Sequence, residues 1–290
     1  MSFASIVRCR AEGSSVSWVT CYDYSLARAV SNSSVDMILV GDSGVMVALG
    51  EKTTSPATMD QMVTFAKAVR RGAPSKPLVG DLPRGSYEPS NEIAVLSAMR
   101  FCKEAECEAV KLEGGARVAP RMAAIVDAGI PVVGHIGLTP QSAAQFGGYR
   151  VTGRSVHEED WLVSEAQALE RAGASAILIE ATPPAAAARI RESVTVPIFG
   201  IGAGPDLDGQ LLIIHDLLGL FPDFRPKFAK NYLVEVLADF ATSLDAEPNL
   251  VQFGRETRRD GFYELAVRSL DLFAREVANG SFPAADYSYV

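Results

Sequence analysis

The amino-acid sequence predicts an α/β protein folded as a (β/α)8 TIM barrel with additional C-terminal helices. Short apolar runs such as MILV and AILI alternate with longer stretches of helical periodicity. Continuous apolar runs are typical of parallel strands that are buried on both faces. Eight strand-and-helix units fit within roughly 220 residues, a length that favours a closed barrel over an open sheet. No Gly-x-Gly-x-x-Gly loop follows the first run, which also disfavours a nucleotide-binding sheet.

The predicted strands and helices follow one another in order along the chain. Thr58 and Gln61 have the spacing of a capping box, which predicts a helix that begins there and ends near Gly72. The eight predicted strands are Ser17–Thr20, Met37–Asp42, Leu78–Asp81, Ala109–Glu113, Val132–His135, Ala176–Glu180, Val196–Gly200 and Leu211–His215. The helices predicted between the later strands are Asn91–Glu106, Arg117–Ala128, Glu158–Ala172 and Pro184–Ser193.

The C-terminal part of the chain has a different pattern. The segment from Lys230 to about Asp260 is less regular, whereas the residues after it have helical spacing and end at Asn279-Gly280. The apolar residues on one face of this final helix are Phe262, Leu265, Ala266, Phe273 and Val277. We expect the segment to pack across the barrel or against a neighbouring subunit. No linker divides the chain, so we expect one domain, residues 1–290, with residues 231–290 as a C-terminal helical extension.

Composition restricts the classes of function. The formal net charge of −8 argues against nucleic acid as a partner, because phosphate binding needs a basic face. No apolar run is long enough for a membrane span, and the N-terminal residues lack the apolar centre of a secretory signal. The four cysteines have no Cys-x-x-Cys spacing, as expected for reduced thiols that serve as small core residues. These features predict a cytoplasmic enzyme that acts on small molecules.

Ionisable residues occur where consecutive predicted strands end. They are Asp42, Asp81, Glu113, His135 and Glu180, and each follows apolar residues that should be buried. In a parallel barrel the active site lies at the carboxyl ends of the strands, so these side chains should meet at one rim. Any one of them alone could be a helix cap, a surface ion-pair member or a core histidine. Their coincidence on five neighbouring strands favours a shared site.

The types of residue at this rim predict a metal site. Asp42, Asp81 and Glu113 would repel one another unless a cation neutralised them. Oxygen ligands without nearby thiolates point to Mg²⁺ or a similar divalent ion rather than Zn²⁺. Because side chains alternate along a strand, Lys111 and Glu113 point to the same side, and Lys111 can bind a substrate carboxylate. Such a site is suited to enolising a 2-oxo acid.

A series of short motifs runs in order from Thr20 to Tyr232. They are TCYDYSLA, VGDS, AVRRGAP, DLP, SYE, VKLEGG, GHIGLTPQS, GGYRVTGR, GIGAG, DGQ, HDLLG and KFAKNY. By this ordered set the sequence resembles the ketopantoate (3-methyl-2-oxobutanoate) hydroxymethyltransferase family. The resemblance implies a (β/α)8 barrel that transfers a hydroxymethyl group from 5,10-methylenetetrahydrofolate to the enolate of a 2-oxo acid. It further implies 3-methyl-2-oxobutanoate as the acceptor, a role in pantothenate biosynthesis, Mg²⁺, and a large homo-oligomer, typically a decamer.

The resemblance also implies roles for individual residues. Glu180 matches the general base, Asp42 and Asp81 the direct metal ligands, and Glu113 a nearby ligand that can act through water. The implied metal ligands are Asp42, Asp81 and Glu113, and the implied substrate-binding residues are Asp42, Ser43, Asp81, Lys111 and His135. No motif can be assigned to the pterin of the folate.

The departures from the family pattern lie in the predicted walls of the site. The stretch Gly44–Pro56 differs, and Arg84 stands where the family commonly has Phe. We hypothesise that Arg84 pairs with an additional carboxylate or polar group on a non-standard acceptor. Three alternatives therefore stay open. They are a specialised relative that uses a different 2-oxo acid, a lyase of the phosphoenolpyruvate mutase/isocitrate lyase type, and a non-catalytic homologue. The loop Lys-Lys-Cys-Gly-His that characterises the lyases is absent from this sequence.

Overall fold

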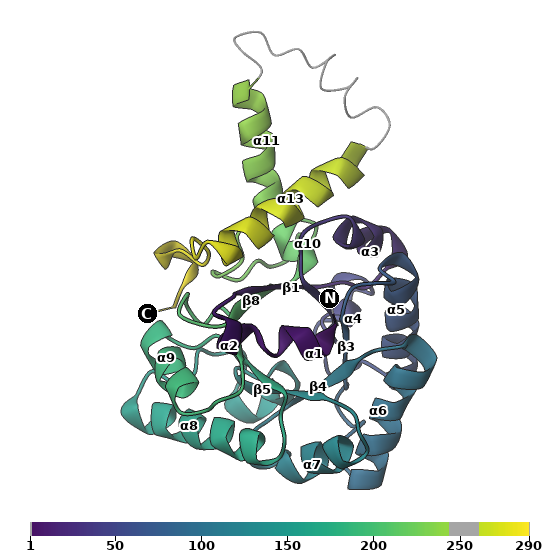
Figure 1. The fold of residues 1–290 in the computed structure, drawn as a ribbon, viewed down its shortest axis with the longest axis vertical. Coiled ribbons are helices and arrows are strands. Elements are labelled where there is room, and N and C mark those ends of the chain that lie inside the picture. Colours follow the sequence, from purple (N-terminus) through teal and green to yellow (C-terminus); the bar gives the residue numbers. More distant parts are fainter. Residues whose placement is uncertain (1, 244–260, 290) are drawn as a thin grey trace.

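In the computed structural model, which describes residues 2–243 and 261–289, eight parallel strands close into a barrel (Figure 1). Each strand pairs with the next, and β8 pairs with β1, so the predicted fold is confirmed. The strands are β1 (Val16–Thr20), β2 (Met37–Val40), β3 (Leu78–Asp81), β4 (Ala109–Glu113), β5 (Val132–Gly137), β6 (Ala176–Glu180), β7 (Ile198–Ile201) and β8 (Gly209–Leu212).

Apolar side chains on both faces hold the strands in the core. All four residues of β2 are buried, as expected for a strand between a barrel interior and an outer helix. Inside the barrel, Trp18 packs edge-on against Phe199 with ring centroids 5.7 Å apart. The predicted last strand is displaced, because β8 ends at Leu212 and His215 lies in the short helix α10 (Ile214–Leu217).

Helices cover the outside of the barrel, and short helices lie before β1, in the loops after strands and near the C-terminal end of the described residues. The capping box predicted at Thr58 and Gln61 is present, with both reciprocal hydrogen bonds at the start of α5. The outer helices are α3 (Tyr24–Ser31), α5 (Met59–Gly72), α6 (Asn91–Ala105), α7 (Ala119–Asp127), α8 (Val156–Arg171) and α9 (Pro184–Glu192). The short ones are α1 (Phe3–Ile6), α2 (Cys9–Glu12), α4 (Gly44–Val47) and the 3₁₀ helices η1 (Pro140–Phe146) and η2 (Ala285–Tyr287).

One glycine permits a close contact beside the site. A Cβ atom at Gly80 would lie 2.4 Å from the ring of Phe101, so only glycine lets α6 pack this closely on β3. Asp81 follows directly and ends the strand. The packing of α6 therefore fixes the backbone that carries this carboxylate.

The C-terminal region corrects two predictions. The segment from Lys230 was expected to be irregular, yet Tyr232–Ser243 forms helix α11; residues 244–260 of that segment lie outside the described residues. Helix α13 (Gly261–Ala278) contacts α3 and β1 and buries Phe273 and Val277. Phe262 is exposed, because the first turns of α13 extend beyond the barrel beside α11 (Figure 1). No helix among the described residues is long and apolar enough to cross a membrane.

A buried carboxyl in α10 makes the stability of the fold depend on pH. Asp216 is only 5% exposed, and burial raises its pKa to about 7, although Arg225 opposes the shift. The unfolded chain has a lower aspartate pKa of about 3.9, so the folded protein binds the proton more tightly. The free energy of unfolding should therefore fall as pH rises from about 4 to 7.

We expect Asp216→Asn to remove this pH dependence. Relative to the variant, the wild-type protein should lose on the order of 2–4 kcal/mol of unfolding free energy between pH 5 and pH 8. Urea denaturation at the two pH values measures the difference, and Asp127→Asn, at an exposed position, is the control. An equal gap between wild type and Asp216→Asn at both pH values would refute this account of the Asp216 carboxyl.

Candidate active site

Five neighbouring strands place ionisable side chains at one end of the barrel. Asp42 follows β2, Asp81, Glu113 and Glu180 end β3, β4 and β6, and His135 lies two residues before the end of β5, which extends beyond the predicted strand. Strand register sets their neighbours: Asp81 lies beside Lys111, and Glu113 lies beside His135. Except for Glu180, whose side chain is 14% exposed, these groups are almost completely buried. The structure thus brings together the residues that strand-end reasoning selected.

Lys111 is at the centre of this cluster. Its Nζ lies 2.7 Å from Asp81 Oδ1 and 3.4 Å from Glu113 Oε1. Burial by itself would lower the pKa of Lys111, but Asp81, Glu113 and Asp42 outweigh burial and raise it. Lys111 is therefore charged, and its charge partly offsets those of the carboxylates.

His135 lies between two carboxylates. Its Nδ1 is 3.3 Å from Glu113 Oε1, and its Nε2 is 3.2 Å from Glu180 Oε2. Burial and Lys111 act to lower the pKa of His135, whereas Glu113 and Glu180 raise it, with a net value of about 9. Glu113 and Glu180 thus favour the protonated ring, although its Nδ1 also lies 3.3 Å from Lys111 Nζ, and Nε2 pairs with Glu180.

The three inner carboxylates have different environments. Burial, Asp81 and Glu113 together raise the pKa of Asp42 well above its usual range. Burial also raises the pKa of Asp81, although Lys111 opposes it. For Glu113 the effect of burial is outweighed by Lys111 and His135, so its pKa is lowered. Asp42 is thus the carboxylate that most lacks a compensating positive charge.

Gln141 is a site residue that strand-end reasoning missed. Its Nε2 donates to Asp42 Oδ2 at 2.9 Å, and its backbone N–H donates to Glu113 Oε2 at 3.0 Å. The buried hydroxyl of Tyr87 donates to Gln141 Oε1 at 2.7 Å and fixes the orientation of the amide. Gln141 lies in η1, not on a strand, and the one sequence signal that could have indicated it is its place in the motif GHIGLTPQS.

Ser43 is held by a second tyrosine. Its hydroxyl is 2.7 Å from that of Tyr22, which donates to Thr20 Oγ1, also at 2.7 Å. A Cβ atom at Gly44 would lie 2.6 Å from the Tyr22 ring, so glycine is needed for this contact. Tyr22 therefore limits the rotation of the serine that follows Asp42.

The backbone after Glu180 is held in an uncommon conformation. Ala181 has φ = 47°, in the left-handed region that residues with a Cβ rarely adopt. Its N–H donates to Ile201 O, and its carbonyl accepts from Thr152 N. These bonds maintain the turn that directs the Glu180 side chain toward His135.

The donor set fits a divalent cation. If all were ionised, four carboxylates (Asp42, Asp81, Glu113 and Glu180) would face two positive groups (Lys111 and His135), a surplus of two negative charges. Within the described residues, no three acidic, histidine or cysteine side chains already surround one metal position. Mg²⁺ is commonly bound by one or two carboxylates together with water, so Asp42 and Asp81 are sufficient. Both oxygens of Glu113 already have protein partners, and so do both oxygens of Asp81, which a bound cation would share with Lys111 and the Asp42 N–H.

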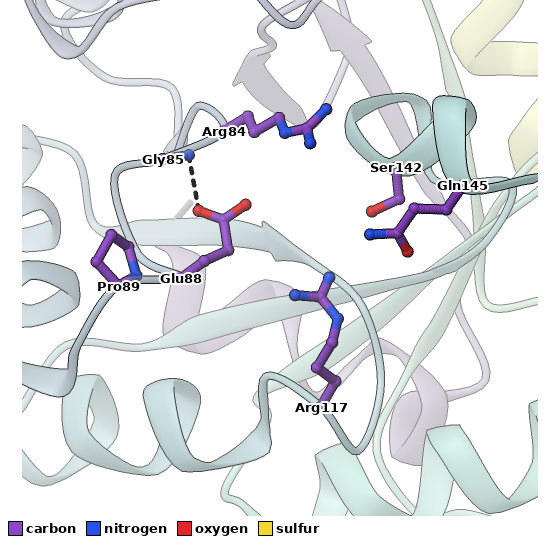
Figure 2. Close-up of a pocket in the computed structure, with 7 residues that line it drawn as sticks. All are labelled: Arg84, Gly85, Glu88, Pro89, Arg117, Ser142 and Gln145. Carbon is purple, nitrogen blue, oxygen red and sulfur yellow. Dashed lines mark hydrogen bonds between the residues drawn. The ribbon is translucent and has the colours of Figure 1, made fainter.

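Two cavities lie beside the cluster, on the outer side of η1. The first has a volume of about 270 Å³ and is lined by both Arg84 and Arg117, together with Glu88 (Figure 2). The second, of about 260 Å³, shares Arg117, Ser142 and Gln145 with the first and extends to Trp161. Neither is lined by the carboxylates of the cluster. Arg84, which departs from the family pattern, therefore lies outside the cluster.

Sequence comparisons with known proteins identify a single enzyme family. The sequence profile of the family "Ketopantoate hydroxymethyltransferase" matches residues 1–246. Two relatives named 3-methyl-2-oxobutanoate hydroxymethyltransferase come from Heliobacterium modesticaldum and Desulfotalea psychrophila. The first is 45% identical over 96% of this chain and 91% of its own length. The second is 49% identical over 78% of this chain and 81% of its own length.

Solved structures with a similar fold have much lower sequence identity. A phosphonopyruvate hydrolase superposes with a TM-score of 0.58 at 14% identity, covering 91% of this chain and 96% of its own. A 2,3-dimethylmalate lyase of the PEP mutase/isocitrate lyase superfamily superposes with a TM-score of 0.56 at 16% identity, covering 96% of this chain and 97% of its own. At this identity the likeness concerns the fold alone.

The central position of Lys111 leads to a prediction about stability. Replacement of Lys111 by Met leaves buried carboxylates without their cation and should lower the free energy of unfolding by about 3–5 kcal/mol at pH 7.5 in EDTA. A second substitution, Asp81→Asn, should recover part of this loss because it removes one of the unpaired charges. Lys103→Met, at an exposed position of α6, is the control.

Thermal and urea unfolding of the single and double variants measure these differences. If Lys111→Met were as stable as the wild-type protein, Lys111 would not be the main compensating charge of the cluster.

Proposed function

The chain belongs to the ketopantoate hydroxymethyltransferase family, and we propose that it transfers a hydroxymethyl group from 5,10-methylenetetrahydrofolate to the enolate of 3-methyl-2-oxobutanoate, giving ketopantoate for pantothenate biosynthesis. The observation that carries this proposal is the buried cluster of Asp42, Asp81, Lys111 and Glu113 next to His135 and Glu180. The four carboxylates provide metal ligands and a base, and Lys111 provides a cation for the substrate.

We propose that Asp42 and Asp81 bind Mg²⁺ or a similar divalent ion directly and that Glu113 acts through water. Asp42 and Asp81 adjoin each other, since the Asp42 N–H donates to Asp81 Oδ2 at 3.0 Å. Lys111 and the hydroxyl of Ser43 are then placed to bind the carboxylate of the 2-oxo acid, and His135 borders the same space. A bound divalent cation would polarise the oxo group of the substrate and make the adjacent C–H more acidic.

Glu180 is the proposed general base. Its carboxylate lies at the edge of the buried cluster, where it can take the proton from C3 of the 2-oxo acid. The ion pair with His135 at 3.2 Å keeps the carboxylate in place before the transfer. The enolate carbon then forms a bond to the one-carbon unit of the folate. Over the whole reaction one water supplies the hydroxyl oxygen, and tetrahydrofolate is released.

A lyase of the phosphoenolpyruvate mutase/isocitrate lyase type is the second candidate. The observation in its favour is the shared fold, since one solved relative in fold is a phosphonopyruvate hydrolase bound to oxalate and Mg²⁺. The missing Lys-Lys-Cys-Gly-His loop speaks against it. A non-catalytic homologue is disfavoured because all the chemical groups of the cluster are present.

We also propose that residues 1–290 act as one domain with residues 231–290 as a helical extension, and that the cytoplasmic protein forms a homo-oligomer, on the family pattern a decamer. Exposed apolar side chains on the extension, such as Val234 and Phe262, support an interface there. Light scattering coupled to size-exclusion chromatography determines the number of subunits.

The activity can be tested directly. With Mg²⁺, methylenetetrahydrofolate and a panel of 2-oxo acids, we expect 3-methyl-2-oxobutanoate to gain one formaldehyde unit, as detected by mass spectrometry. Chelation by EDTA should abolish the product, and added Mg²⁺ should restore it. Product only from a different acid would identify a specialised relative, and no product from any acid would count against both.

Glu180→Gln should separate proton transfer from substrate binding. Loss of the base should slow exchange of the substrate C3 proton with D₂O by about 10²- to 10⁴-fold. The dissociation constant of 3-methyl-2-oxobutanoate should change little, because Lys111 and Ser43 remain. Proton NMR follows the exchange, and Glu192→Gln, at the end of α9, is the control. Exchange at the wild-type rate in Glu180→Gln would exclude Glu180 as the base.

A further inference from the structure

The cavity of about 270 Å³ beside the carboxylate cluster has the chemistry of an anion site (Figure 2). Arg84 and Arg117 reach toward it from two different loops, and Ser142 and Gln145 lie on the side of the cavity opposite Glu88. Guanidinium groups bind carboxylates through paired hydrogen bonds, and hydroxyl and amide groups add further donors. Glu88 supplies one opposing charge, so the cavity keeps a surplus of one positive charge.

The donors of the two arginines are only partly used. Arg84 Nη1 donates to the carbonyl oxygen of Gln141 at 3.0 Å, which orients the guanidinium and leaves its other edge available. Arg117 has no hydrogen bond or ion pair within 4 Å among the described residues, but its charge acts on Glu165, where it opposes the rise in pKa that burial causes. The Glu88 carboxylate is held by the Gly85 N–H at 2.7 Å. The two guanidinium groups therefore keep free donors toward the cavity, while Glu88 and Glu165 balance part of their charge.

The helix η1 separates this cavity from the metal side of the site. Gln141 contacts Asp42 through its side chain and Arg84 through its main-chain oxygen, so this residue connects the cluster to the arginine cavity and lies between them. A small 2-oxo acid held by Asp42 and Asp81 would have to extend through this wall to reach Arg84. A longer ligand, with its reactive end over the barrel mouth, can pass around the wall. This geometry disfavours our hypothesis that Arg84 pairs with the 2-oxo acid.

We propose that this cavity, defined by Arg84 and Arg117, binds the carboxylates of the glutamyl tail of the folate co-substrate. The inference rests on the proposed function, which supplies a folate whose reactive methylene is remote from its carboxylates. The second cavity shares Arg117, Ser142 and Gln145 with the first and continues past Trp161. Glu165 also lines the second cavity, so the surplus of positive charge is in the first cavity and the second adds space for the rest of the tail. Arg84 is then a determinant of folate recognition particular to this chain.

The experiment compares folates with and without the tail. Michaelis constants are measured for 5,10-methylenetetrahydrofolate, for its triglutamate and for 5,10-methylenetetrahydropteroate, which lacks glutamate. We expect Arg117→Ala to raise KM for the two glutamylated folates about three- to tenfold and to leave the pteroate unaffected. Arg84→Phe, which installs the residue common in the family, should act in the same direction. The KM of the 2-oxo acid and kcat should change less than twofold.

Arg171→Ala is the matched control, since Arg171 is exposed at the opposite end of helix α8 from Trp161. Circular dichroism of each variant checks that the fold is intact. Calorimetric titration with tetrahydrofolate and with tetrahydropteroate provides a second measurement that does not depend on turnover. Wild type should bind the glutamylated compound more tightly, and Arg117→Ala should bind the two about equally.

The outcomes distinguish this inference from the proposed function. If wild type forms product but Arg117→Ala and Arg84→Phe keep the wild-type preference for glutamylated folates, the inference is overturned and the function stands. If wild type forms no product yet binds tetrahydrofolate in an Arg117-dependent manner, the folate site stands and the proposed reaction fails. Failure of wild type to bind either compound overturns the inference. Turnover of dicarboxylic 2-oxo acids that is lost only in Arg84→Phe also overturns the inference, because Arg84 would then bind the 2-oxo acid and not the folate.

Discussion

The ammonium group of Lys111 lies among three carboxylates with almost no access to water. Removing such charges from water costs several kcal/mol per ion unless each finds partners of opposite charge. The partners come from different parts of the chain: Asp81 from β3, Glu113 from β4 and Asp42 from the loop after β2. They meet only in the register that places Asp81 beside Lys111 and Glu113 beside His135. Barrel closure and the electrostatics of the site thus depend on each other.

The same cluster explains why the site favours binding of a divalent cation. Lys111 and His135 compensate part of the negative charge, whereas burial, Asp81 and Glu113 raise the pKa of Asp42 and so disfavour its ionised form until a cation is bound beside it. Gln141 and Tyr87 orient the carboxylates through neutral hydrogen bonds and leave their charge unchanged. A site built in this way favours a doubly charged ligand while the fold holds the ligand oxygens in place.

Sequence reasoning succeeded where the strands themselves determine position. Asp81, Glu113 and Glu180 end parallel strands and His135 lies two residues before the end of β5, and the carboxyl ends of parallel strands meet at one rim whatever the loops do. Gln141 and Tyr87 lie in loops, and no periodicity specifies how a loop folds back over a rim. Helix α11 was missed for a related reason: Tyr232–Ser243 is apolar on most of its faces, which obscures the helical period. Arg84 was noticed as unusual, but only the position of η1 indicates which ligand it can reach.

Two neighbouring residues of the short helix η1 face two different parts of the site. Gln141 points to Asp42, whereas its neighbour Ser142 lines the arginine cavity. A 3₁₀ helix has about three residues per turn, so loss or gain of a single residue would rotate the rest of the helix by roughly 120°. Loops at the rim of a barrel usually accept changes of length during evolution. The η1 loop should therefore accept substitutions but not changes of length. An insertion or a deletion would turn Gln141 away from Asp42 and Ser142 away from the arginine cavity at the same time.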